Sequence, residues 1–216
     1  MICVSIGERS LTVAQRQLRR YQFVEVRIDL MRPSLEDLRS LVPRGTTVIA
    51  TCRPGAWSDG KRLQYLLRAI ELGASYVDVE LDSPKRYRER INHAARERGC
   101  RIIISHHDMR RTPSTAGLRS IATRAFDAEA DIVKIACFVR TLRDNANLLG
   151  LLGESRWSGR LVVVGMGALG QITRIAAPMM GAPFTFASAG AGRETASGQL
   201  SADALKQIWK KIGWKL

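Results

Sequence analysis

The feature that most constrains the fold is a regular alternation of short apolar runs with charged helical stretches along all 216 residues. The apolar runs are rich in β-branched residues, which is typical of buried strands. We expect strands at residues 2–6, 23–28, 47–52, 76–80, 101–105, 131–137, 161–166 and 183–187. We expect helices near residues 11–20, 34–41, 61–72, 84–98, 115–128, 140–152, 169–180 and 201–212.

Strands that alternate with helices pair in parallel through right-handed crossovers. Eight such units predict a single (β/α)8 TIM barrel that forms one domain over residues 1–216. An open, flavodoxin-like sheet is the alternative. Several boundary residues agree with the expected elements: Ser34 with Asp37 and Ser201 are typical of helix starts, and Gly73 and Gly99 of helix ends. The Gly-Ala-Gly-Arg stretch at 190–193 is suited to a flexible lid.

The composition indicates neither a membrane protein nor a secreted one. No apolar run approaches the ~20 residues that span a bilayer, and the first ten residues lack the pattern of a secretory signal. The four cysteines form no CxxC pair and no zinc-ligand spacing, so we expect reduced cysteines in the core and no bound metal. We therefore predict a cytoplasmic protein without a membrane partner.

The net charge of +14 raises the question of a nucleic-acid partner. The arginines are spread along the chain and interleave with carboxylates on expected helices, for example at 85–90. This pattern is typical of solvated helix faces, so we predict no nucleic-acid partner. The charge is also expected to favour encounter with small anions.

Two expected strands have one apolar face and one charged face. Side chains alternate along a strand, so Glu25, Arg27 and Asp29 share one face of the second strand. Asp78 and Glu80 share the corresponding face of the fourth. If the apolar faces pack on the helices, the charged faces point into the barrel, where charges are costly unless paired. Because barrel enzymes hold their sites at the carboxyl ends of the strands, these residues are candidates for function as well as for a buried ion-pair network.

Lys134 lies in the middle of an apolar strand, between Val133 and Ile135. Burial disfavours an ammonium and leaves a neutral amine, which can attack a carbonyl to form an imine. The alternative is a structural lysine paired with Asp78 or Glu80. The preceding strand ends in His106 and His107, which face opposite ways if the backbone stays extended, so only one can point toward Lys134. A histidine there can transfer protons near neutral pH.

Other polar residues follow the expected strands. Arg53 follows the third, Arg174 begins the helix after the seventh, and Thr195–Gln199 follows the eighth. An arginine at a strand end can hold a carboxylate. Gly165 and Gly167 do not complete a G-x-G-x-x-G pattern, and we predict no nucleotide or other cofactor. His93 is expected at the surface of a helix.

Taken in order, these segments resemble the type I 3-dehydroquinate dehydratase family. The matching segments are Glu25–Asp29 (E-x-R-x-D), Thr51–Arg53 (T-x-R), Tyr76–Leu81, Ser105–Asp108 followed by Thr112-Pro113, Asp131–Ala136 (D-x-x-K-I-A), and Met166 with Thr173-Arg174 and Thr195–Gln199. The resemblance covers nearly the whole chain, in the form of the shorter family members. Each motif alone is weakly specific, whereas their common order is specific.

The resemblance implies a barrel lyase of the shikimate pathway of aromatic amino acid biosynthesis, which dehydrates 3-dehydroquinate through a Schiff base and without a metal. It implies catalytic roles for Lys134 and His107, and substrate-binding roles for Glu25, Arg27, Arg53, Arg174, Thr195 and Gln199. The family's Glu-Gly-Gly segment, whose glutamate orients the histidine, is missing after Arg53, so we expect Asp59 or Glu80 to take that part. The resemblance also implies a homodimer.

Two other functions remain open. Another imine-forming barrel, such as a class I aldolase, would share Lys134 but would not require the set of Arg27, Arg53 and Arg174. A nucleic-acid binder would need a clustered basic face or exposed aromatic residues, and the sequence indicates neither.

Overall fold

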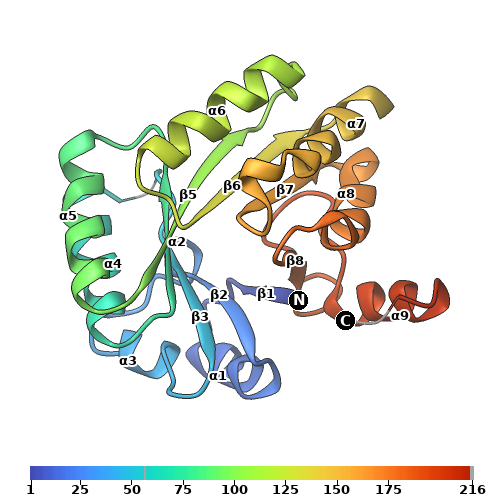
Figure 1. Ribbon diagram of the computed structural model, residues 1–216. Coiled ribbons are helices and arrows are strands. Elements are labelled where there is room, and N and C mark those ends of the chain that lie inside the picture. Colours follow the sequence, from blue (N-terminus) through green and yellow to red (C-terminus); the bar gives the residue numbers. More distant parts are fainter. Residues whose placement is uncertain (56, 215–216) are drawn as a thin grey trace. The chain divides into compact units, whose positions relative to one another are not determined.

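The computed structural model describes residues 1–55 and 57–214. The strands are β1 (Ile2–Ile6), β2 (Phe23–Arg27), β3 (Thr47–Thr51), β4 (Tyr76–Glu80), β5 (Arg101–Asp108), β6 (Ile132–Phe138), β7 (Leu161–Met166) and β8 (Thr185–Ser188). The α-helices are α1 (Leu11–Arg20), α2 (Ile28–Met31), α3 (Leu38–Leu41), α4 (Asp59–Glu71), α5 (Lys85–Glu97), α6 (Thr115–Asp127), α7 (Leu142–Gly150), α8 (Gln171–Ala176) and α9 (Ala202–Lys211). Short 3-10 helices are η1 (Leu151–Gly153), η2 (Ser155–Trp157), η3 (Ala168–Gly170) and η4 (Ala177–Met180). Figure 1 shows these elements along the chain.

The eight strands follow one another in a single sheet in the order β7-β6-β5-β4-β3-β2-β1-β8. The pairs β1–β2, β2–β3, β3–β4 and β6–β7 are parallel. The strands at the two ends of this order, β7 and β8, also contact each other. This arrangement is the predicted (β/α)8-barrel fold class, and the open-sheet alternative is wrong.

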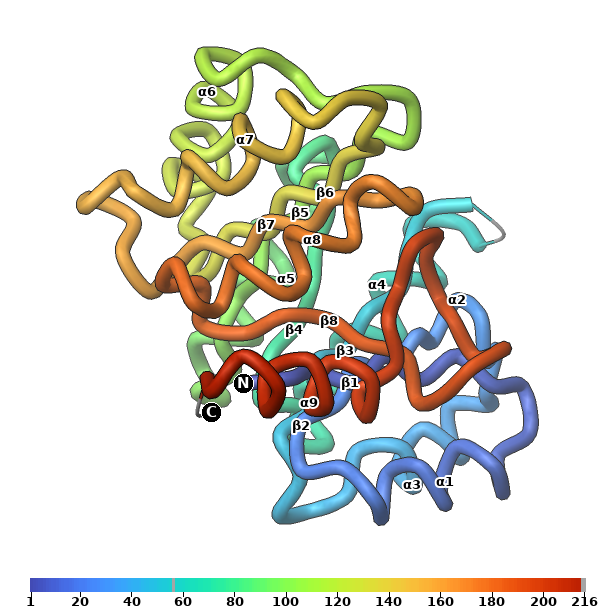
Figure 2. Tube along the Cα trace, turned by 90° about the vertical axis from the view of Figure 1, so that its right-hand side faces the viewer, coloured from blue at the N-terminus to red at the C-terminus, as the bar shows by residue number. Residues whose placement is uncertain are grey.

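The chain divides into two compact units. The amino-terminal unit comprises Val4–Ile103, and the carboxy-terminal unit comprises Met1–Cys3 with Ile104–Leu216. In the amino-terminal unit α4 and α5 lie side by side, and α1 packs along α3 (Figures 1 and 2). In the carboxy-terminal unit α7 packs against both α6 and α8, and α8 covers β7.

The apolar faces of strands and helices meet in a core of the expected composition. The core includes the expected apolar residues of β2 and the residue after it, Val24, Val26 and Ile28. It also includes Leu66 and Ile70 from the inner face of α4. Removing such side chains from water is the main stabilising contribution to folding. The cysteines at positions 3, 52, 100 and 137 are free and buried, as predicted. Burial raises the pKa of the Cys52 and Cys137 thiols to about 12.

Several expected boundaries were wrong for identifiable reasons. Ser34 Oγ accepts from Asp37 N at 3.0 Å, but these residues form a turn and the helix itself begins only at Leu38. The helix predicted over 169–180 is interrupted by Pro178, so α8 ends at Ala176 and the 3-10 helix η4 follows. The short helix α2, directly after β2, was not expected. Strand β5 runs on to Asp108, beyond the predicted residue 105.

The helix-end predictions were otherwise confirmed. Ser201 Oγ accepts from Ala204 N at the start of α9. Gly73 and Gly99 have φ angles of +94° and +65°, the left-handed region in which glycine ends helices without strain. No helix in the described ranges combines the length and apolar character needed to cross a membrane.

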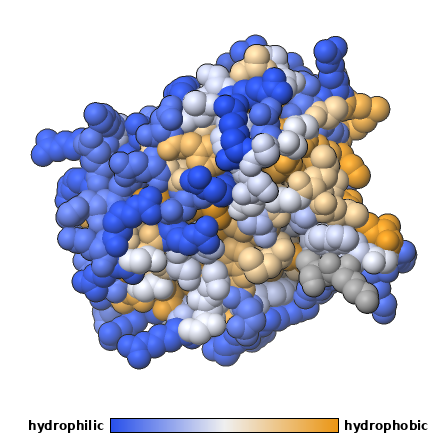
Figure 3. All heavy atoms as spheres, in the orientation of Figure 1, coloured by the Kyte–Doolittle hydropathy of each residue, from blue (hydrophilic) through white to orange (hydrophobic). Residues whose placement is uncertain are grey.

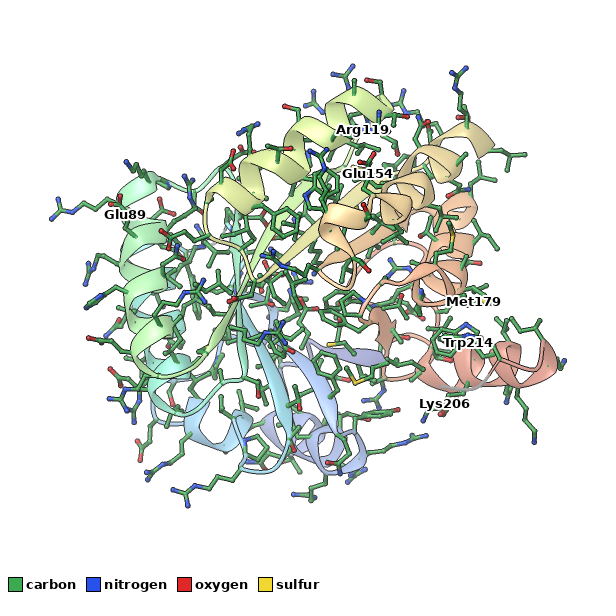
Figure 4. The ribbon with its side chains drawn as sticks, viewed as in Figure 1. Glu89, Arg119, Glu154, Met179, Lys206 and Trp214 are labelled. Atoms are coloured by element: carbon green, nitrogen blue, oxygen red, sulfur yellow. The ribbon has the colours of Figure 1, made fainter. Side chains whose placement is uncertain are left out.

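The charged helices present solvated faces. Lys85 and Glu89 form an exposed pair on α5, and Figure 4 shows Glu89 pointing away from the ribbon. His93 is also exposed and lies 3.2 Å from Glu97, so its surface position is confirmed. Arg119 of α6 meets Glu154 of the turn between η1 and η2 at 2.7 Å (Figure 4).

Candidate functional site

Glu25 is a buried carboxylate at the centre of a polar network in the amino-terminal unit, and its side chain is 4% exposed. The register aligns Ser5 of β1 with Glu25 of β2. Ser5 Oγ donates to Glu25 Oε2 at 2.6 Å, and Thr51 Oγ1 donates to Oε1 at 2.9 Å. Two hydroxyl donors thus solvate a carboxylate that water does not reach, which offsets part of its desolvation cost.

Arg53 joins three carboxylates. Its Nη1 and Nη2 donate to the two oxygens of Asp78 at 2.8 and 2.7 Å, a bidentate pair. Nη1 also donates to Glu80 Oε1 at 2.7 Å, and Nη2 lies 3.9 Å from Glu25 Oε1. Burial alone would lower the pKa of Arg53, but the attraction of Asp78, Glu80 and Glu25 outweighs it and raises that pKa.

The structure therefore brings together Glu25, Arg53 and Glu80 of the predicted site, with Asp78 as a further member. Asp78 has a fully buried side chain, and the register places it beside Thr51. The predicted pattern of charged inner faces on β2 and β4 is confirmed within this unit.

Arg27 and Asp59 lie at other points of the same unit. Arg27, the last residue of β2, forms a bidentate pair with Asp29 at 3.0 and 2.7 Å. Burial lowers the pKa of Arg27, but the bond to Asp29 and the charge of Glu25 raise it above its ordinary value. Asp59 is 55% exposed at the start of α4 and pairs with Arg62 at 2.7 Å.

Lys134 lies on β6 in the carboxy-terminal unit and is 6% exposed, so the predicted burial is confirmed. Its Nζ lies 3.8 Å from the centre of the Phe186 ring of β8. Arg174, 1% exposed on α8, donates from Nη1 to the Phe186 carbonyl oxygen at 3.2 Å. Lys134 and Arg174 therefore contact the same residue, one through its ring and the other through its backbone.

The backbones of Gly165 and Gly170 approach each other closely, which positions α8 and therefore Arg174. A Cβ atom on Gly170 would lie 2.4 Å from the carbonyl carbon of Gly165, so only glycine fits between η3 and β7. Thr173 Oγ1 accepts from Gly165 N and donates to Gly170 O, both at 2.7 Å. This buried hydroxyl joins β7 to the start of α8, one residue before Arg174.

The segment after β8 is folded back on itself. Gln199 Oε1 accepts from Thr195 N at 2.8 Å and from Thr195 Oγ1 at 3.3 Å. Gly167 N donates to Ser197 O at 3.2 Å, so this segment rests on the loop after β7. Gly198 has a φ angle of +73°, and a Cβ atom there would lie 2.2 Å from Gly167 O.

His107 lies near the end of β5 and is half-buried. Because β5 stays extended through Asp108, His106 and His107 lie on opposite faces of the strand. The choice of His107 as the catalytic histidine stays a prediction. Both residues predicted to orient it, Asp59 and Glu80, have an arginine partner within the amino-terminal unit.

Sequence reasoning missed three contributors. Phe186 was assigned only to a strand, although its ring packs edge-on against that of Phe184, with 5.5 Å between the two ring centres. Ser5 was overlooked as a polar residue within an apolar strand, and Thr173 was noted only beside Arg174. In the described ranges no group of three or more His, Cys, Asp or Glu residues could hold a metal ion.

These two groups of residues differ in chemistry. The amino-terminal group offers paired guanidinium and carboxylate groups, which suit hydrogen bonding to hydroxyls. The carboxy-terminal group offers a buried amine, a buried guanidinium and a fixed amide, which suit covalent attack on a carbonyl and the binding of an anion.

Comparison with known proteins gives a consistent result. The family model for type I 3-dehydroquinase matches residues 2–214. The 3-dehydroquinate dehydratase of Methanocaldococcus jannaschii is 33% identical over 229 residues, which cover 100% of both chains.

Solved structures show the same fold. A type I 3-dehydroquinate dehydratase from Clostridium difficile has a TM-score of 0.86 at 21% identity and covers 98% of this chain and 91% of its own. A 3-dehydroquinate dehydratase from Geobacillus kaustophilus has a TM-score of 0.86 at 23% identity and covers 98% of this chain and 90% of its own.

Proposed function

Because the chain belongs to the type I 3-dehydroquinase family, we propose that it dehydrates 3-dehydroquinate to 3-dehydroshikimate through an imine on Lys134. This activity is a step of the shikimate pathway of aromatic amino acid biosynthesis. The observation that carries the covalent part is the burial of Lys134 in an apolar strand, against the ring of Phe186. Lysine is rarely buried in an apolar strand for structural reasons alone, and a buried amine is suited to act as a nucleophile.

The proposed reaction begins with attack of the neutral Lys134 amine on the ketone carbon of the substrate. Loss of water from the adduct gives an iminium, which withdraws electrons and acidifies the neighbouring C–H bond. His107 accepts that proton and then delivers it to the departing hydroxyl group, which leaves as water. A second water hydrolyses the imine, releases 3-dehydroshikimate and restores the amine. The iminium supplies the positive charge that stabilises the developing carbanion.

The remaining residues are assigned to binding. Arg174 would hold the substrate carboxylate, since its guanidinium is buried and fixed through Phe186. Glu25, Arg27, Arg53, Thr195 and Gln199 would bind hydroxyl groups or order the site. Asp59 or Glu80 would orient His107. Support comes from their arginine partners, Arg62 for Asp59 and Arg53 for Glu80, which hold each carboxylate in one position.

The imine is tested by borohydride reduction in the presence of 3-dehydroquinate, followed by peptide mass spectrometry. We expect one stable adduct, on Lys134, and none in Lys134→Ala. An adduct on another lysine, or none in the unmodified protein, would refute the assignment. His107→Ala should still form the adduct while turnover falls by roughly 10²- to 10⁴-fold. If His106→Ala has that effect instead, the two histidines have been assigned the wrong way round.

The same reaction separates the dehydratase from an imine-forming aldolase. Cleavage of a carbon–carbon bond in a screen of hydroxy-ketone substrates, with no dehydration of 3-dehydroquinate, would favour the aldolase. Salt-sensitive binding of DNA or RNA without lyase activity would favour a nucleic-acid binder.

We propose further that the two compact units belong to one catalytic domain. Support comes from the family model, which spans both, and from β1 and β5, each of which contributes residues to both units. A single calorimetric transition whose enthalpy equals the van't Hoff enthalpy is expected. Two resolved transitions would contradict the proposal.

The proposed homodimer is supported by an uncharged apolar surface on η3, α8 and η4. Its exposed residues are Leu169, Ile172, Met179 and Met180. The segment 161–192 carries only one charged side chain, that of buried Arg174, so a second copy of this +14 chain can approach here without charge repulsion. Hydrophobic atoms gather along the right-hand edge of Figure 3, where α7 and α8 lie in Figure 1.

Sedimentation should give twice the chain mass of 24.0 kDa. The double variant Ile172→Glu/Met179→Glu should sediment as a monomer, whereas Leu30→Glu, an exposed position on α2, should not change the mass. A monomeric unmodified protein would contradict the dimer.

We also propose a cytoplasmic location. It is supported by the four free, buried cysteines, which are typical of a reducing compartment. Cell fractionation tests this location.

A further inference from the structure

A cavity of about 460 Å³ lies in the amino-terminal unit between α1, α3 and the turn before β3. Its volume is in the range of cavities that hold small molecules. Its polar lining comes from Gln15, Arg19, Gln22, Ser40, Arg44 and Thr46. Figure 2 shows α1 and α3, which form two of its walls, running side by side.

The cavity lies at the amino-terminal ends of β2 and β3. Gln22 directly precedes β2 and Thr46 directly precedes β3. The candidate residues Arg27 and Thr51 are at the other ends of the same strands, five residues and about 16 Å from Gln22 and Thr46 at ~3.3 Å per residue. In (β/α)8 enzymes the catalytic residues lie at the carboxyl ends, so this cavity is separate from the site described above.

The charged residues that line the cavity are all positive. No lining residue carries a carboxylate. Within the described parts of the chain, Arg19 and Arg44 have no carboxylate partner, whereas Arg62, Arg68 and Arg119 each pair with one. The helix dipole favours a basic residue in the last turn of α1, which explains the position of Arg19. The dipole does not explain Arg44, which comes from a separate turn and lines the same cavity.

The walls are held in place without a ligand. Gly45 has a φ angle of +83°, a left-handed conformation that sets the turn carrying Arg44. Leu38 and Leu41 anchor α3 in the core, and Thr47 N donates to Gln22 O at 2.9 Å. Preformed walls lower the entropic cost of binding.

We propose that this cavity binds a small anion with two or more negative charges, of the carboxylate or phosphate type. Each guanidinium takes one anionic group through its planar pair of donors. The side-chain amide of Gln15 and the hydroxyl of Thr46 donate to the remaining oxygens. Because the ligand joins α1 to the turn before β3, it stabilises the folded unit by mass action.

The test is calorimetric titration of the full chain with sodium citrate and, separately, sodium pyrophosphate, at constant ionic strength set with sodium chloride. We expect saturable binding of at least one probe and a higher Tm in its presence. Arg19→Gln/Arg44→Gln should weaken that binding at least tenfold. The matched control, Arg16→Gln/Arg39→Gln, removes the same charge from α1 and α3 outside the cavity and should change binding less than twofold.

Binding of citrate alone or of pyrophosphate alone identifies the carboxylate or the phosphate class. Absence of saturable binding by both probes overturns the proposal, and so does an equal loss in both double variants, which would reflect net charge. The bound probe should leave the KM for 3-dehydroquinate unchanged. A raised KM that persists in Arg19→Gln/Arg44→Gln would place the anion at the catalytic end and also overturn it.

Discussion

The ammonium nitrogen of Lys134 lies 3.8 Å from the centre of the Phe186 ring, closer than the ~6 Å limit for an attractive cation–π contact. The ring therefore lies directly against the nitrogen that the proposed reaction uses as its nucleophile. The same phenylalanine fixes Arg174 through its carbonyl oxygen. Phe186 therefore connects the proposed nucleophile with the proposed carboxylate-binding residue.

Phe186→Leu should slow imine formation, because the ring holds the Lys134 nitrogen in place. A contact of this kind contributes about 0.5–2 kcal/mol, so its loss should lower the rate of borohydride-trapped adduct formation about 2- to 30-fold. Phe184→Leu is the control, because Phe184 touches the Phe186 ring edge-on and leaves the contact with Lys134 in place. Equal trapping rates in Phe186→Leu and the unmodified protein would show that the ring does not place the amine.

Arg53→Ala should destabilise the protein by about 3–5 kcal/mol, because Asp78 and Glu80 lose their shared cation while Asp78 is fully buried. Urea unfolding measures this loss. Arg68→Ala, which breaks the exposed pair with Glu71, should cost less than about 1 kcal/mol. Similar losses for the two variants would show that the Arg53 network contributes little to stability.

Gly198→Ala should lower kcat/KM about 10- to 100-fold, because the new Cβ atom collides with Gly167 O and displaces Thr195 and Gln199. Gly192→Ala is the matched control: it has a similar φ angle of +74°, but its Cβ atom would meet nothing within 4 Å. Steady-state kinetics of both variants separate the collision from backbone strain. Equal activity in the two would remove the 195–199 segment from the site.

Asp144 should contribute to stability in a pH-dependent way through the start of α7. Burial would raise its pKa, but the N–H groups of Arg140 and Thr141 donate to the carboxylate and hold that pKa below the ordinary value of 3.8. A group with a lowered folded-state pKa stabilises the protein fully above its unfolded pKa and loses this effect as the pH falls through the folded one.

Asp144→Ala should therefore cost about 0.5–2 kcal/mol at pH 7, and the difference from the unmodified protein should shrink below about pH 4. Unfolding free energies measured from pH 7 to pH 3 check this. Thr141→Ala, which removes the other half of the capping box, should retain a cost at pH 3. A constant difference for Asp144→Ala across this range would contradict the assignment.

Several strands were predicted accurately from short apolar runs. The limits of β1, β4 and β7 match the expected residues, because runs rich in β-branched residues are visible in the sequence. Helix limits were less accurate where a local contact decides them. The turn at Ser34 and the proline at 178 shortened two helices that periodicity alone had extended.

The candidate site shows the same division. Burial of Lys134 and of Glu25 followed from their places in strands with apolar neighbours. Asp59 was chosen by its place after Arg53, and its role beside His107 stays a prediction. Its position at the start of α4 and its pair with Arg62 come only from the structure. Phe186 has no polar side-chain group, so nothing in the sequence indicated that it would contact Lys134 and Arg174.

The sequence by itself determined the eight β/α units, the buried strand faces and the presence of an amine in an apolar strand. These follow from periodicity and residue type, which are properties of neighbouring residues. Only the tertiary structure decided that Arg53 pairs with both Asp78 and Glu80, and that Phe186 lies between Lys134 and Arg174. Such contacts depend on strand register and on the close approach of Gly165 to Gly170, which join residues far apart in the chain and therefore leave no local pattern.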